Sequence, residues 1–201
     1  MGKKKFIKNF WSLHVDEAIV ANWLKEKLPK SCEVFFPVNS QFQYVDLIVY
    51  NSKNKKTTTI QVKGSKAYEE KYDNKIYWTS RHKFWTSKIN PDKVDFFIFS
   101  CFSVFSKSAS KKTGSRNIEN YFVVFPTTEL KKYIRRMKLS KYLGSEKEIS
   151  FSFYQYPENG KKNLYEDWHL KEYYEKNGYE NLKPINRNRN NWEQIRSKLS
   201  N

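Results

Sequence analysis

The stretch Tyr44–Ser65 constrains the fold of this chain most, because it predicts a β-hairpin. Its two arms, Tyr44–Tyr50 and Thr57–Lys63, are rich in valine, isoleucine, threonine and tyrosine, which fit a pleated sheet. Between them, Asn51–Lys56 contains only asparagine, serine and lysine, which is typical of a polar turn. We therefore expect two antiparallel strands joined by a loop of moderate length.

The expected register gathers polar side chains on one face of this hairpin. With the turn centred in the middle of the loop, Asp46 falls opposite Lys63, and side chains alternate between the two faces of a strand. Asp46, Gln61 and Lys63 then share one face. That face is either an ordinary solvent-exposed surface or a divalent-metal site. In a metal site, Asp46 and the Gln61 carbonyl oxygen are hard ligands that suit Mg²⁺. Lys63 then orients or activates a water, or stabilises the charge that develops on a phosphate.

A helical pattern precedes the hairpin. Apolar residues recur at three- and four-residue spacing from Val15 onward, and Pro29 ends the pattern, so we expect a helix over Leu13–Leu28. Glu17 falls between the apolar stripe and solvent. Asp16 is interpreted as a first-turn acid, a position that the helix dipole favours for a negative charge.

These residues carry a resemblance to a known family. Asp46, followed after fourteen intervening residues by Gln61-Val62-Lys63, resembles the signature of the PD-(D/E)XK nuclease superfamily, in its branch with Q-x-K in place of E-x-K. The segment His14–Leu28 resembles the first helix of that superfamily, which carries a glutamate to the active site, here Glu17. The resemblance covers roughly residues 10–135, and it departs from the family pattern at Val45, where proline is usual.

The resemblance implies both a fold and an activity. The fold is α/β, with a restriction-endonuclease-like mixed central sheet flanked by helices in residues 1–156. Beyond the resemblance, we expect residues 157–201 to form a mainly helical extension packed on this core, which covers the sheet, contacts DNA or mediates dimerisation. The activity is that of a Mg²⁺-dependent DNA endonuclease of restriction, homing or junction-resolving type. Glu17, Asp46 and Gln61 are then the metal ligands, with Mn²⁺ able to substitute, and Lys63 positions or deprotonates the attacking water. We expect a homodimer, because many such nucleases cut both DNA strands as pairs.

The remaining chain predicts further elements by their composition and periodicity. These are strands over Cys32–Pro37, Val94–Phe105, Tyr121–Pro126 and Ile149–Tyr156, a loop or helix start over Gly64–Asp73, and a helix over Thr127–Leu139.

The charge of the chain favours a nucleic-acid partner. A formal net charge of +17 on 201 residues draws a protein to polyanions, although a lysine-biased genome would also raise it. In Ile76–Asn90, basic residues alternate with aromatic ones, which suits either base stacking or a partly buried segment that fills the core. The candidate DNA contacts are Ser65, Lys66, Arg81, His82, Lys83, Lys111, Lys112 and Arg116. His82 is additionally considered as a general base.

Other classes of protein are disfavoured. Cys32 and Cys101 belong to no C-x-x-C pair, so we expect free buried thiols and no structural zinc. No apolar run has the length of a membrane span and the N-terminus lacks a signal-peptide core, so we expect a cytoplasmic protein.

Two functions compete with the endonuclease. The neutral Gln61 invites a nuclease fold that has lost its metal and only binds nucleic acid. A general basic scaffold protein would bind RNA at least as well as DNA.

Overall fold

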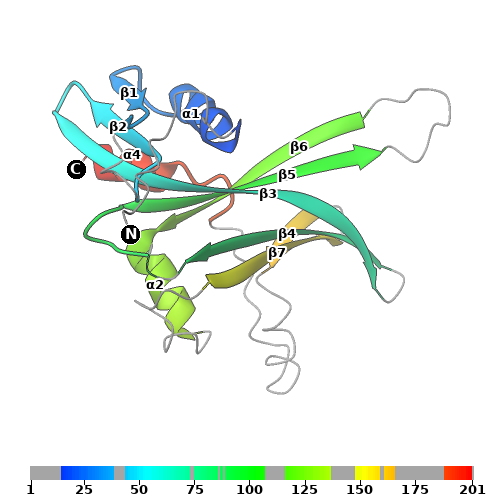
Figure 1. The fold of residues 1–201 in the computed structure, drawn as a ribbon. Helices are drawn as coiled ribbons and strands as arrows, with labels where there is room; N and C mark the ends of the chain where they lie inside the picture. The colour runs from blue at the N-terminus through cyan, green and yellow to red at the C-terminus, as the bar shows by residue number, and fades with distance from the viewer. Residues whose placement is uncertain are drawn as a thin grey trace, which may run out of the picture.

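The computed structural model describes residues 15–38, 44–72, 75–85, 87, 89–106, 116–136, 148–158, 161–165 and 188–200 (Figure 1). Its elements in chain order are α1 (Val15–Lys27), β1 (Cys32–Phe35), β2 (Leu47–Asn51), β3 (Lys56–Tyr72), β4 (Lys75–Trp85), β5 (Phe96–Ser106), β6 (Arg116–Pro126), α2 (Thr127–Arg136), β7 (Glu148–Glu158), β8 (Lys161–Tyr165) and α4 (Glu193–Ser200). The fold is therefore α/β, as the sequence predicts.

The eight strands form one branched mixed sheet, and its part made of β1, β2, β3, β5 and β6 is a five-stranded mixed sheet flanked by helices. In the other branch, the order runs from β3 through β4 and β7 to β8. The predicted hairpin is present, with β2 antiparallel to β3 from Leu47↔Ile60 to Asn51↔Lys56. On its other side, β3 runs parallel to β5, and β6 closes the sheet as the antiparallel neighbour of β5. The long β3 thus lies at the centre of the architecture.

The second half of β3 differs from the prediction. Gly64–Asp73 was expected to form a loop or begin a helix, but β3 continues to Tyr72, pairing with β5 as far as Ala67 and with β4 from there onward. Pairing with neighbouring strands satisfies its backbone groups and outweighs the weak strand preference of its glycine, lysine and glutamate residues. Figure 1 shows β3 curving away from β5 to join β4 and β7.

Two apolar clusters fill the two faces of the sheet. On one face, Val20 and Leu24 of α1 pack with Val62 of β3, together with Trp192, Ile195 and Leu199 from the C-terminal segment. On the other face, α2 and β7 cover β5 and β6, where Phe97, Phe99, Val123, Tyr133 and Phe153 are buried together. Because neighbouring residues of β3 face opposite clusters, each polar residue on this strand has a defined side.

The C-terminal segment belongs to the same core. The predicted boundary after Tyr156 falls inside β7, which forms a hairpin with β8. Further on, Asn188 Nδ2 donates a hydrogen bond to Val124 O at 2.9 Å, and Asn190 Oδ1 accepts one from Phe122 N at 2.9 Å. These bonds lead the chain along β6 into α4.

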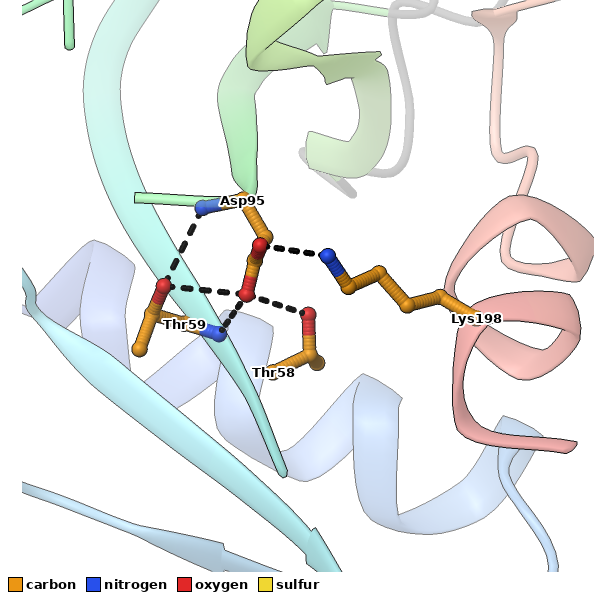
Figure 2. Close-up of polar contacts among 4 residues, drawn as sticks. All are labelled: Thr58, Thr59, Asp95 and Lys198. Carbon is orange, nitrogen blue, oxygen red and sulfur yellow. Dashed lines mark hydrogen bonds and ion pairs between the residues drawn. The ribbon is translucent and has the colours of Figure 1, made fainter. Parts of the chain in front are cut away.

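A carboxylate joins α4 to the sheet (Figure 2). Asp95 Oδ2 accepts hydrogen bonds from Thr58 Oγ1 at 3.1 Å, Thr59 N at 2.9 Å and Thr59 Oγ1 at 3.1 Å, and Asp95 Oδ1 pairs with Lys198 Nζ at 2.6 Å. Burial opposes ionisation of Asp95, but these hydrogen bonds and the charge of Lys198 outweigh it and lower the pKa of the carboxyl. The cluster fixes the start of β5 against β3.

Candidate metal-binding site

Asp46 lies immediately before β2, and its carboxylate is held against β3. Asp46 N donates a hydrogen bond to Ile60 O at 2.9 Å, while Asp46 Oδ2 accepts one from Val62 N at 2.8 Å. The same oxygen accepts a hydrogen bond from Gln61 Nε2. Backbone and side chain of Asp46 therefore both attach to the strand that carries the Q-x-K sequence.

The register of the hairpin differs from the predicted one by two residues. Leu47 pairs with Ile60, which places Asp46 beside Gln61 and not opposite Lys63. A shift of two residues leaves every side chain on its predicted face, because side chains alternate with a period of two. The predicted meeting of Asp46 with Gln61 is found for this reason.

The Gln61 amide leaves one of its atoms unused. Gln61 is 3% exposed and Asp46 is 8% exposed, so both side chains are buried. A carboxylate only accepts hydrogen bonds, so the amide nitrogen of Gln61 turns toward Asp46 and the amide oxygen turns elsewhere. That oxygen, Oε1, is buried and has no hydrogen-bond partner. An unpaired buried acceptor costs about 1–3 kcal/mol, and a bound cation would remove that cost.

Lys63 follows on the same face of β3. It is half-buried and pairs with Phe99 of β5, just as Gln61 pairs with Phe97. Phe97 and Phe99 both belong to the cluster on the α2 side of the sheet. Gln61 and Lys63 therefore face the same side, two residues apart, as the sequence predicts.

Glu17 approaches β3 from the other side. It is 6% exposed and lies on the same face of α1 as Val20 and Leu24, which pack against Val62. The sequence placed Glu17 between the apolar stripe and solvent, whereas the structure buries it against the sheet and leaves Val15 73% exposed. The Glu17 carboxylate is therefore buried beside β3, the strand that carries Gln61 and Lys63.

The first turn of α1 contributes a second carboxylate that the sequence interpretation missed. A Cβ atom on Gly64 would lie 1.8 Å from Asp16 Oδ2, so the Asp16 carboxylate rests directly on the backbone of β3. Asp16 is more than the exposed first-turn acid that its position suggested. The sequence signal for this contact is Gly64, because a glycine inside a strand often marks a site where another group approaches the backbone closely.

The predicted DNA contacts fall at several places. Ser65 is half-buried in β3 opposite Cys101, and Lys66 follows it. Arg81 and Lys83 occupy β4 positions that pair with Ser152 and Ser150 of β7. Arg116 begins β6, whereas Lys111 and Lys112 lie outside the described residues.

His82, a candidate DNA contact and general base in the sequence, is buried in the core. His82 is 1% exposed, because β4 folds over β5 and brings the ring between Phe99 and Phe153, with centroid distances of 5.1 and 5.4 Å. Its Nε2 atom lies 3.4 Å from Cys101 Sγ. Burial lowers the pKa of His82 to about 3, against a smaller opposing effect of the Lys63 backbone, so the imidazole is neutral near pH 7. The ring is a core residue.

The two cysteines are buried free thiols, as the sequence predicts. Burial raises the pKa of Cys101 to about 12, so this thiol is not a nucleophile near pH 7. Among the described residues, no three side chains of histidine, cysteine, aspartate or glutamate gather as a metal-binding group. The Asp46–Gln61 pair differs from such a group, because one of its two oxygen donors is a neutral amide and not a carboxylate.

Comparisons of the chain with protein-family models, with curated proteins and with solved structures gave no match. In the part of the chain that the structure describes, no helix has the length and apolar character needed to cross a bilayer.

Proposed function

We propose that this protein is a Mg²⁺-dependent DNA endonuclease of the PD-(D/E)XK type. The observation that carries the proposal is the buried, unpartnered Oε1 of Gln61 beside the Asp46 carboxylate, with Lys63 next on the same face. Hard oxygen donors of this kind suit Mg²⁺, with Mn²⁺ as a substitute. The α/β fold with a mixed sheet is compatible with this type of nuclease.

The proposed roles follow from how each residue is held. Asp46 and Gln61 would hold the cation once the Gln61 amide is rotated so that Oε1, and not Nε2, lies beside the Asp46 carboxylate. The Val62 N–H fixes the orientation of that carboxylate. Glu17, which the resemblance offers as a third ligand, packs from α1 on the opposite side of β3, so the proposal assigns it no direct ligand role. Lys63 positions or deprotonates the water that attacks the phosphorus. When bound, Mg²⁺ supplies a Lewis acid that polarises a phosphoryl oxygen and offsets charge on the leaving oxygen.

The charge of the chain supports a polyanionic substrate. A net charge of +17 attracts the phosphate backbone, and binding through phosphates weakens steeply with salt. A homodimer is part of the proposal, because two copies of a single site provide one for each strand of a duplex. Restriction, homing and junction resolution all fit this chemistry.

Incubation with supercoiled plasmid tests the proposal. The wild-type chain is expected to nick and then linearise the plasmid with Mg²⁺ or Mn²⁺ and to leave it intact in EDTA. Intact plasmid under every metal condition, with the protein folded, would contradict the proposed hydrolysis.

A binding protein without catalysis is the second candidate. The neutral Gln61 favours this candidate. The segment after Lys63 favours it too, because β3 continues there into a hairpin with β4 instead of forming the expected loop or helix start. This candidate predicts salt-sensitive DNA gel shifts without cutting. Competition with RNA then separates it from a general basic scaffold, which would bind RNA at least as well.

A further inference from the structure

An aromatic side chain is exposed on β1, the strand at one end of the sheet (Figure 1). Phe35 is 51% exposed, and in the part of the chain that the structure describes the other large exposed apolar side chains are Val15, Phe36 and Val38. Three of these four lie together at the end of β1. A cluster of apolar side chains in contact with water is a feature of binding surfaces.

Phe35 lies on the face of the sheet that α1 does not cover. Cys32 and Val34 of β1 pack in the apolar cluster to which α1 contributes. Side chains alternate between the two faces of a strand, so Glu33 and Phe35 project from the opposite face. Both of these side chains are exposed, and this face of β1 is therefore open to solvent.

The strand register connects Phe35 with the proposed cation site. Phe35 pairs with Ile48 of β2, and Ile48 pairs with Thr59 of β3, so the three residues form one row across a single face. Asp46 and Gln61, two residues away from Ile48 and Thr59, form the next row on that face. Successive rows are about 7 Å apart. The open face therefore leads from Phe35 to the Asp46–Gln61 pair.

A second ring and a positive charge belong to the same region. Tyr50 of β2 pairs with Glu33 and is half-buried, in the row on the other side of Phe35. The exposed Lys93 has its Nζ atom 4.3 Å from the ring centroid of Tyr44, two residues before Asp46. Rings on the open face and a cation beside the segment that leads into Asp46 suit a ligand with bases and phosphates.

We propose that the open face of β1 and β2 binds a single strand of DNA, with an unpaired base stacked on Phe35. This inference rests on the proposed function, and it names DNA with unpaired bases as the substrate class. Exposed aromatic rings on a sheet stack unpaired bases, whereas a duplex keeps its bases inside. The net charge of +17 favours this occupant over a second copy of the chain, because like charges repel and phosphates are attracted.

Fluorescence anisotropy with a short fluorescein-labelled oligothymidine, measured in EDTA, tests this role without any cleavage. Phe35→Ala is expected to bind the oligonucleotide about tenfold more weakly than wild type, the usual loss when a stacking ring is removed. Phe35→Leu should be equally weak, because it keeps an apolar side chain without a ring. Phe35→Trp should bind at least as tightly as wild type.

Two controls isolate stacking on Phe35 from other effects. Val15→Ala removes a side chain that is 73% exposed on α1, and it should bind the oligonucleotide like wild type. A blunt duplex should bind wild type and Phe35→Ala equally, because its bases are not available to the ring.

The possible failures are distinguishable. If Phe35→Ala binds the oligonucleotide as tightly as wild type, the inference fails, while plasmid cleavage by the wild type still supports the proposed function. If Phe35→Ala weakens binding but the wild type cuts no plasmid, the proposed hydrolysis fails and the stacking surface stands. If Phe35→Ala turns a wild-type dimer into a monomer in sedimentation and leaves the oligonucleotide affinity unchanged, this face joins two copies and the inference is overturned.

Discussion

DNA cleavage by the Lys63→Ala variant is expected to be slower than that of wild type by about 10²–10³-fold, the usual loss when one group that stabilises a transition state is removed. Lys63 is half-buried on the face of β3 that carries Gln61, two residues further along the strand. The proposal therefore assigns its ammonium group to the attacking water or the substrate phosphate. The measurement is the single-turnover rate of plasmid nicking with saturating Mg²⁺.

The same variant should bind Mn²⁺ nearly as wild type does, because Asp46 and Gln61 stay in place. This separates Lys63 from the ligands: Asp46→Ala is expected to lose both cleavage and Mn²⁺ binding. Lys53→Ala, which removes an exposed lysine from the turn of the same hairpin, is the matched control and should cut at the wild-type rate. Equal rates for Lys63→Ala and Lys53→Ala would remove Lys63 from the mechanism.

Acidification is expected to destabilise the folded protein at a pH where most carboxylates are still ionised. The pKa of His82 is about 3 in the folded chain, because the ring is buried between Phe99 and Phe153. In the unfolded chain, histidine has its ordinary pKa near 6.5 and binds a proton that the folded state excludes. The free energy of unfolding should therefore fall by about 2–3 kcal/mol between pH 7 and 4.5.

The sign follows from linkage. A group that binds its proton more weakly when folded contributes full stability above its unfolded pKa, and that stability is lost as the pH falls from about 6.5 toward the folded value. Asp95 contributes only at lower pH, because the pKa of that carboxyl is itself lowered. Urea denaturation at a series of pH values measures the slope for wild type and for His82→Gln. The slope of the variant should be smaller by nearly one proton.

Absolute stability does not enter this comparison, since His82→Gln is expected to be less stable at every pH. Nuclear magnetic resonance of the wild type gives a second readout, in which the His82 ring should not titrate between pH 8 and 4.5. Titration of that ring near pH 6.5 would contradict its burial in the core.

Local sequence predicts those elements whose apolar residues are the ones that the fold buries. The β2–β3 hairpin, the apolar β5 and the helix α2 follow from composition and periodicity alone, because each buries the residues that its pattern marks as apolar. The face shared by Asp46, Gln61 and Lys63 was also predictable. A two-residue error in register leaves the alternation of side chains unchanged.

Long-range contacts determined the rest. The strand character of Gly64–Tyr72 depends on β4 and β5, which lie later in the chain, so no local signal predicts it. His82 looked like a surface group among basic residues, and only the folding of β4 over β5 makes it a core residue. The position of Asp16 against Gly64 depends on how α1 crosses the sheet, which periodicity does not specify.

Thermal unfolding of the Gln61→Glu variant with and without Mn²⁺ tests most directly whether Asp46 and residue 61 together bind a cation. Without metal, a carboxylate in place of the amide would lie against Asp46 and repel it, so the melting temperature should fall below that of wild type. With Mn²⁺, the extra negative ligand should raise the melting temperature by more than in wild type. A variant whose melting temperature is unchanged by Mn²⁺, alongside a wild type that is equally indifferent, would show that this pair is a buried polar contact and not a metal site.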